Sequence, residues 1–237
     1  MATAHDIEER ESTWGVLDAG VVLVGTQFVS IVWAVLMIGI LWQGEYPDPL
    51  TPAALVVLSV GLWGGYGLGS ALTAQQRGNG PGVEYGALLR WRDVPPGLVL
   101  GVGTQFALIP LYDLIGRFYE RDPGTTAEEL IGAIDTPLDY LLIVFAVVVM
   151  APLVEEVFFR GLLLQSLDRR WGAVVGVAVS SVLFAAVHLE WVLMPGLTLF
   201  GVISALAVLK TGRLGVSWIM HAAFNLTTVL LIAFDLT

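Results

Sequence analysis

Apolar residues occur along this chain in long continuous runs, not in alternation with polar ones. The runs lie at about 17–42, 50–73, 96–119, 138–168, 171–189, 192–209 and 214–235. A helix of about 20 residues is long enough to cross a bilayer core of ~30 Å. Strands of a membrane barrel would alternate apolar and polar positions, so continuous runs predict helices. The sequence therefore predicts an all-α, polytopic transmembrane helical bundle of about seven spans, with eight as the alternative.

The spacing of polar residues divides the chain into three parts. Residues 1–16 form an acidic N-terminal segment, and residues 17–137 hold the first apolar helices and their loops. Residues 138–237 contain most of the ionisable residues that lie within apolar runs. We interpret this last part as the membrane core that holds the candidate functional residues.

Composition removes several classes of function. Of the 237 residues, 56% are hydrophobic and only 14% are charged, whereas soluble domains carry roughly 25% charged residues. The chain has no cysteine, which excludes disulfides, thiol catalysis and cysteine-bound zinc. Its formal charge of -10 argues against nucleic acid as a partner, because phosphates require a basic surface. The partner that composition predicts is the lipid bilayer.

Basic residues predict the orientation, since cytoplasmic loops hold an excess of Lys and Arg. Counted through seven spans, nearly all bases fall on one side: Arg10, Arg77, Arg90, Arg92, Arg169, Arg170, Lys210 and Arg213. The sequence predicts an integral protein of the cell membrane with a cytoplasmic N-terminus and an external C-terminus. An eighth span would move the C-terminus to the other side.

The fourth run contains two adjacent acids and an arginine, Glu155, Glu156 and Arg160. An ionisable group at membrane depth costs at least ~2.5 kcal/mol, so each is a candidate for function. Glu156 and Arg160 are one helical turn apart and can pair, which leaves Glu155 free to face elsewhere. The alternative is a wet loop after a helix that ends near Pro152.

Later runs add two histidines and an amide. His188 ends the fifth run, and Phe184 lies one turn before it, where it can wall the same pocket. His221 and Asn225 are also one turn apart in the seventh run, so both project to one side. At a rise of 1.5 Å per residue, these groups could converge in the middle to inner half of the bilayer.

Three motifs on successive helices carry a specific resemblance. They are Glu-Glu-x-x-x-Arg at 155–160, Phe-x-x-x-His at 184–188 and His-x-x-x-Asn at 221–225. This order resembles the CPBP family of intramembrane proteases, which includes the Rce1-type CAAX prenyl endopeptidases and the Abi proteins. The motifs cover the C-terminal third to half of the chain, and residues 1–137 match only as apolar helices. The lack of a clear eighth span departs from the family pattern.

The resemblance implies a helical core with a cavity open to the cytoplasm. It implies that Glu155 and His188 activate water and that His221 and Asn225 stabilise the oxyanion, with Glu156, Arg160 and Phe184 in support. The expected activity is hydrolysis of a membrane-associated peptide, such as one carrying a lipid near its C-terminus.

The chemistry of the residues agrees with an endopeptidase. Without cysteine, peptide hydrolysis needs an activated water, for which a carboxylate such as Glu155 can be the general base. A zinc-dependent alternative would use Glu155, His188 and His221, since a His2Glu set is a known catalytic zinc site. The chain lacks His-Glu-x-x-His, so we favour the glutamate mechanism and expect no cofactor.

Two other functions fit parts of the pattern. A non-enzymatic immunity or partner protein could keep the fold without activity, although all the expected catalytic residues are present. A proton-coupled transporter could use the acids and histidines as a relay, but it should show inverted repeats, and the polar residues lie only in the second half.

Overall fold

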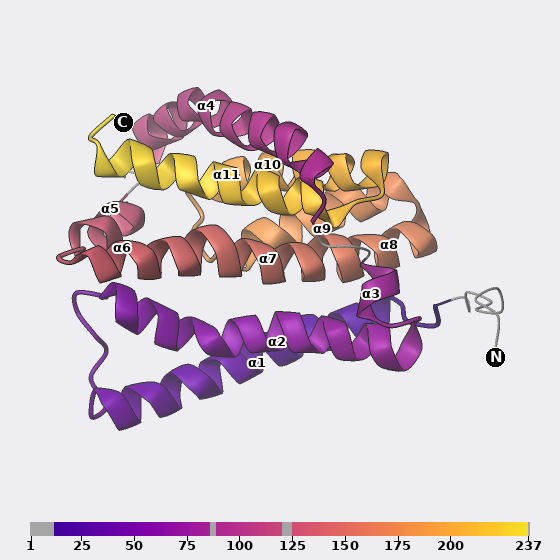
Figure 1. Ribbon diagram of the computed structural model, residues 1–237, viewed down its shortest axis with the longest axis horizontal. Coiled ribbons are helices and arrows are strands. Elements are labelled where there is room, and N and C mark those ends of the chain that lie inside the picture. The colour runs from indigo at the N-terminus through magenta and orange to yellow at the C-terminus, as the bar shows by residue number, and fades with distance from the viewer. Residues whose placement is uncertain (1–11, 86–88, 120–124, 237) are drawn as a thin grey trace.

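The computed structural model describes residues 12–85, 89–119 and 125–236, and every regular element in this part is a helix (Figure 1). The first two, α1 (Val16–Leu41) and α2 (Pro52–Arg77), pack side by side as a hairpin. Thr51 begins α2, because its Oγ1 accepts a hydrogen bond from the Ala54 amide at 3.3 Å. Residues 1–11 of the acidic segment predicted for 1–16 lie outside the described residues.

A short helix, α3 (Pro81–Glu84), and a 3₁₀ turn, η1 (Trp91–Asp93), lead into α4 (Val94–Tyr119). Helix α4 packs along the last helix, α11 (Leu214–Ala233). Arg213, which precedes α11, holds the two helix ends together, since its Nε donates to Oδ1 of Asp93 at 2.6 Å and its Nη2 donates to Oδ2. A small helix, α5 (Thr125–Gly132), follows α4.

One long helix of 35 residues, Pro137–Trp171, crosses the centre of the molecule. It consists of α6 (Pro137–Ile143), α7 (Ala151–Glu156) and α8 (Leu164–Trp171), joined by two π-helical segments, η2 (Val144–Met150) and η3 (Val157–Leu163). Such π-helical turns are frequent at functional sites. Gly172 ends the long helix in a left-handed conformation with φ +85°. Figure 1 shows this helix between the α1/α2 hairpin and α11.

Two further helices complete the bundle, α9 (Ala173–Ala186) and α10 (Met194–Thr211). They approach each other closely at Gly201 of α10, which has no side chain. A Cβ added there would lie only 2.9 Å from Cβ of Ser181 on α9. Gly212, at φ +65°, ends α10 just before α11 begins.

The structure confirms the predicted polytopic helical bundle. In the described part of the chain, six helices are long and apolar enough to cross a membrane. The fifth predicted span, 171–189, is the apolar helix α9 of 14 residues, which is shorter than the ~20 that a crossing requires. The start of α1 and the end of α11 lie at opposite ends of the bundle (Figure 1).

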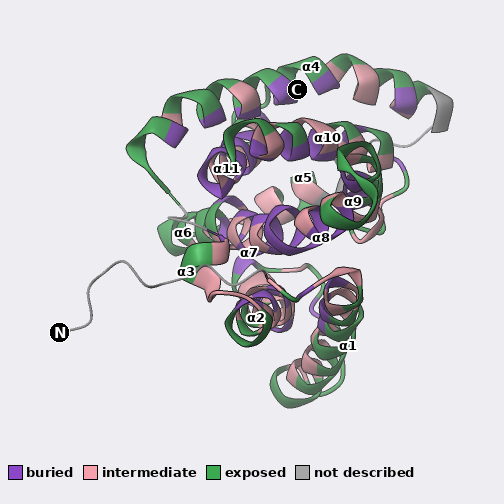
Figure 2. Ribbon diagram, turned by 90° about the vertical axis from the view of Figure 1, so that its right-hand side faces the viewer, coloured by how far each residue is buried: buried purple, intermediate pink, exposed green. Residues whose placement is uncertain are grey.

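Burial also follows the pattern of a membrane protein. Figure 2 shows exposed residues along α1 and α4 and buried residues where the central helix meets α9, α10 and α11. The exposed side chains on α1 include large apolar ones, such as Val21 at 72% and Phe28 at 68%. An apolar surface of this extent is typical of contact with lipid.

Candidate active site

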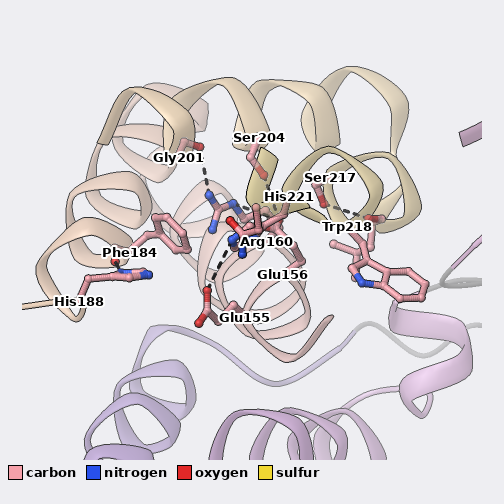
Figure 3. A network of polar contacts seen from close by, with 12 residues as sticks. Glu155, Glu156, Arg160, Phe184, His188, Gly201, Ser204, Ser217, Trp218 and His221 are labelled. Atoms are coloured by element: carbon pink, nitrogen blue, oxygen red, sulfur yellow. Dashed lines mark hydrogen bonds and ion pairs between the residues drawn. The ribbon is translucent and has the colours of Figure 1, made fainter. Parts of the chain in front are cut away.

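The two adjacent acids of the central helix point to different partners. Glu155 and Glu156 form the last turn of α7, immediately before the π-helical segment η3, and both are buried. Figure 3 shows Glu155 directed towards the ribbons of α1 and α2, whereas Glu156 lies on the side of α10 and α11. This divergence is the one expected of neighbouring helical residues, which differ by about 100° in direction.

Glu156 is the most highly connected of these groups. Its Oε2 accepts a hydrogen bond from Ser204 Oγ of α10 at 2.9 Å and lies 3.4 Å from Nε of Arg160. Its Oε1 lies 3.0 Å from Nδ1 of His221 on α11. A buried carboxylate is costly unless charged and hydrogen-bonded partners surround it, and these three contacts meet that need. Glu156 therefore links the central helix to α10 and α11.

Arg160 is fully enclosed, with 0% of its surface exposed. Besides its ion pair with Glu156, its Nη2 donates to the Gly201 carbonyl at 3.4 Å. Its guanidinium carbon lies 4.5 Å from the centre of the Phe184 ring, which is cation–π geometry. The pairing of Glu156 with Arg160 is the one that their spacing of four residues predicts.

His221 brings the two acids together. While Nδ1 of its ring faces Glu156, Nε2 lies 3.9 Å from Oε2 of Glu155 (Figure 3). This second separation is longer than a direct hydrogen bond. One imidazole thus lies between both carboxylates of the motif.

His188 lies just beyond the end of α9, beside Phe184. Its Nδ1 is 2.7 Å from the Phe184 carbonyl oxygen. Because a carbonyl only accepts, Nδ1 carries the proton of this bond and Nε2 of the neutral ring is left as an acceptor. The Phe184 ring centre lies 4.9 Å from that of His188 and 5.6 Å from that of His221, so Phe184 separates the two imidazoles. In the described part of the chain, neither a hydrogen bond nor an ion pair joins His188 to Glu155.

Asn225 has a partner that the sequence did not indicate. Its Nδ2 donates a hydrogen bond of 2.7 Å to the carbonyl of Val147 in the π-helical segment η2. Four residues along a helix correspond to a rise of about 6 Å, so the amide lies one turn away from the acids that His221 meets. One of the two amide hydrogens is used in this bond.

The residues weighed as zinc ligands do not converge. In the part of the chain that the structure describes, no group of three His, Asp or Glu side chains is arranged to hold a metal ion. His221 directs Nδ1 to Glu156, and His188 lies on the other side of Phe184. The donor set of Glu155, His188 and His221 therefore does not fit zinc in this arrangement.

Two features that position the site were missed in the sequence. Ser204 is a polar residue in an apolar helix, but nothing local connects it with Glu156. Gly97 and Gly101 have the Gly-x-x-x-Gly spacing typical of close helix packing. An added Cβ at Gly101 would lie 2.2 Å from the Met220 carbonyl, so α4 touches α11 directly beside His221.

An apolar cavity of about 320 Å³ lies next to the acids, between α2, α3 and the central helix. Its walls include Gly67, Ala71, Tyr85, Val154 and Val157. Val154 directly precedes Glu155, so the cavity flanks the turn that carries the two acids on the side of α2.

Fold and site together define a polytopic helical membrane protein with a buried cluster of carboxylates and imidazoles. Residues 137–227 match the family model of the Rce1-like type II CAAX prenyl endopeptidases. This match confirms the resemblance to the CPBP family over that segment, and the segment contains all three motifs.

A curated relative is similar to part of this chain. A protein of Escherichia coli described as "Uncharacterized 24.3 kDa protein" is 31% identical over 88 residues, which is 35% of this chain and 41% of that protein. The chain thus spans about two fifths of the length of the curated relative that it matches. No solved structure matches the chain.

Proposed function

We propose that this protein is an intramembrane endopeptidase that hydrolyses a peptide bond of a membrane-associated substrate with water activated by glutamate and histidine. The observation that carries this proposal is the contact of His221 with both acids of a buried motif, at 3.0 Å to Glu156 and 3.9 Å to Glu155. The similarity of residues 137–227 to Rce1-like endopeptidases supports it.

Glu155 is the proposed general base. Glu156 is neutralised by Arg160 and fixed by Ser204, whereas the polar contact of Glu155 among the described residues is the longer one with His221. Its carboxylate is thus the one able to take a proton from water, whose oxygen then attacks the scissile carbonyl. That proton passes to the amine nitrogen as the C–N bond breaks. His188 assists through Nε2, which its bond to the Phe184 carbonyl leaves as an acceptor.

His221 and Asn225 are the proposed donors to the oxyanion. Glu156 orients the His221 imidazole through Nδ1, so Nε2 is the atom that faces the oxyanion, and it donates in the doubly protonated form of the ring. Asn225 has one amide hydrogen beyond the one given to Val147. Donors fixed before the reaction stabilise developing charge without reorganisation. No step of this mechanism uses a metal.

The proposed substrate is a membrane-bound peptide that carries a lipid near its C-terminus. Two properties support this class: the family description names prenyl endopeptidases, and the cavity beside Val154 has apolar walls. An apolar chain gains roughly 0.8 kcal/mol for each CH₂ that it buries in such walls.

The experiment compares membrane peptides from cells that carry wild-type protein with those from cells that carry Glu155→Ala. In the wild type only, we expect peptides whose new ends mark a cleavage site. In the variant, we expect the uncleaved C-terminal peptide of the same substrate to persist. Arg77→Ala is the matched control, because Arg77 is exposed and pairs only with Asp18 and the N-terminal segment. Identical peptides in the wild type and Glu155→Ala would instead favour the non-enzymatic partner protein.

We also propose that the N-terminus is cytoplasmic. The basic residues gather at the end of the bundle where α1 begins: Arg77 pairs with Asp18, and Arg169 lies 3.7 Å from the Trp14 ring centre. An excess of bases marks the cytoplasmic side. The chain has no cysteine, so single cysteines at Lys210 and at Gly44 can be labelled in intact cells. We expect an impermeant maleimide to label position 44 only. Labelling of position 210 alone would show that the N-terminus lies outside.

A further inference from the structure

Tyr66 of α2 is packed against the helix that carries both acids. It is 1% exposed, and its ring stacks on Phe158 at 4.6 Å and meets Phe159 edge-on at 5.5 Å, between ring centres. Both phenylalanines lie between Glu156 and Arg160 in the sequence. Tyr66 lies outside residues 137–227, so the family match assigns it no role.

The hydroxyl of Tyr66 is oriented by a neighbour and still has a proton to donate. Nε2 of Gln27 on α1 donates to the Tyr66 oxygen at 3.0 Å. Among the described residues, no hydrogen-bond acceptor receives the hydroxyl hydrogen itself. A hydroxyl can donate one hydrogen bond and accept others, so the Tyr66 hydroxyl keeps its capacity to donate while it accepts from Gln27.

Tyr66 is at the level of Glu155. An added Cβ at Gly67 would lie 3.5 Å from Cγ1 of Val154, so the residues next to Tyr66 and next to Glu155 face each other across the interface of α2 and α7. Figure 3 shows Glu155 directed towards the α1/α2 side, away from α10.

The apolar cavity lies at the same place. Gly67 and Val154 are both in its walls, so it runs beside the Tyr66 and Glu155 pair. A peptide that reaches Glu155 from this cavity would have α2 on one side and the central helix on the other. His221 belongs to α11, on the opposite face of the central helix, but its Nε2 reaches to 3.9 Å from Oε2 of Glu155.

We infer that Tyr66 is a further catalytic residue, whose hydroxyl donates a hydrogen bond to the scissile carbonyl oxygen while Glu155 activates the attacking water. The inference rests on the proposed endopeptidase function. The proton remains on the tyrosine throughout, so the step is stabilisation of charge and not proton transfer. Gln27 is a positioning residue, because its amide fixes the direction of the hydroxyl.

The test measures kcat and KM of purified full-length protein on a peptide that spans a cleavage site found by the membrane-peptide comparison above. Tyr66→Phe keeps the ring that packs on Phe158 and removes only the hydroxyl. Loss of one oxyanion donor lowers kcat by about 100-fold or more. We expect a loss of this size, with KM within about threefold and the melting temperature unchanged. Gln27→Leu should lower kcat by less, because the hydroxyl is kept but not oriented.

The matched control is Tyr112→Phe. Tyr112 is a tyrosine of α4 whose hydroxyl lies against Gly196 of α10, away from Glu155. The Tyr112→Phe variant should keep the wild-type kcat. If Glu155→Gln is inactive and Tyr66→Phe retains wild-type kcat, the role of Tyr66 is overturned while the proposed function stands. If no cleavage depends on Glu155, the proposed function is overturned and the role of Tyr66 with it.

Discussion

The Nδ1 atom of His221 lies 3.0 Å from Oε1 of Glu156, and the other oxygen of the same carboxylate meets Ser204 and Arg160. Glu156 is therefore bound on both sides by groups from two other helices. Glu155, its neighbour in sequence, has only the 3.9 Å approach of His221. The two acids of one motif thus differ in their contacts, and this difference supports the separate tasks proposed for them.

Removing the charge of each acid separately should distinguish these tasks. We expect Glu155→Gln to abolish cleavage with little change in melting temperature, because Glu155 makes few contacts. Glu156→Gln should retain some activity but lower the melting temperature, since Arg160 is then a buried cation without a counter-charge. Cleavage rates and thermal unfolding of both purified variants measure this. A variant pair with the reverse pattern would assign the catalytic role to Glu156.

Arg160→Ala should damage the fold as well as the activity. It leaves Glu156 buried without its cation, and breaking a buried ion pair from one side costs about 3–5 kcal/mol. Arg77→Ala removes an exposed partner of Asp18 and should cost no more than about 1 kcal/mol. Thermal unfolding in detergent and the amount of protein in membranes compare the two variants. Equal stability of both would show that Arg160 is not needed to neutralise Glu156.

Asn225→Ala should lower stability in addition to activity. The change leaves the Val147 carbonyl without its hydrogen bond, and a buried polar group left unpaired costs about 1–3 kcal/mol. Thr227→Ala is the control from the same helix, since Thr227 bonds only to the Ala223 carbonyl one turn before it. If Asn225→Ala unfolds at the wild-type temperature but no longer cleaves the substrate, the amide acts on the substrate alone.

Activity should survive removal of metal ions. The mechanism proposed above needs only side chains, and the donors Glu155, His188 and His221 do not converge on one point in the described residues. The measurement is the cleavage rate after treatment with a strong chelator, with bound metal assayed in the same sample. Loss of activity that stoichiometric zinc restores would establish the zinc-dependent form of the protease.

The contact of Glu84 with the N-terminal segment should weaken in acid. Burial alone would raise the pKa of Glu84, but hydrogen bonds from Ser12 Oγ and from Asn79 outweigh it and hold the pKa below 4.5. A carboxyl whose pKa is lowered by folding stabilises the fold above its ordinary pKa, and this stabilisation is lost as the pH falls through the lowered value. The difference in melting temperature between wild type and Glu84→Gln should thus be constant above about pH 5 and shrink below it. A difference that grows in acid would contradict this assignment.

Local regularities in the sequence determined the fold class and one contact of the site. Run length predicts membrane helices because a helix satisfies its own backbone groups in lipid, whatever its neighbours are. The pair of Glu156 and Arg160 follows from helical periodicity, which places residues four apart on one face. The three motifs, read in order, indicated the protease family before any packing was known.

Only the tertiary structure decided which helices meet and therefore which side chains complete the site. Ser204 and His221 reach Glu156 because α10 and α11 pack on the central helix, and their separation along the chain gives no sign of it. The same packing brings the Asn225 amide to the carbonyl of Val147 and places Tyr66 opposite the turn that carries Glu155. Periodicity fixes the face of a helix on which a residue lies, whereas its partner depends on close packing between helices, which many apolar sequences permit in several arrangements.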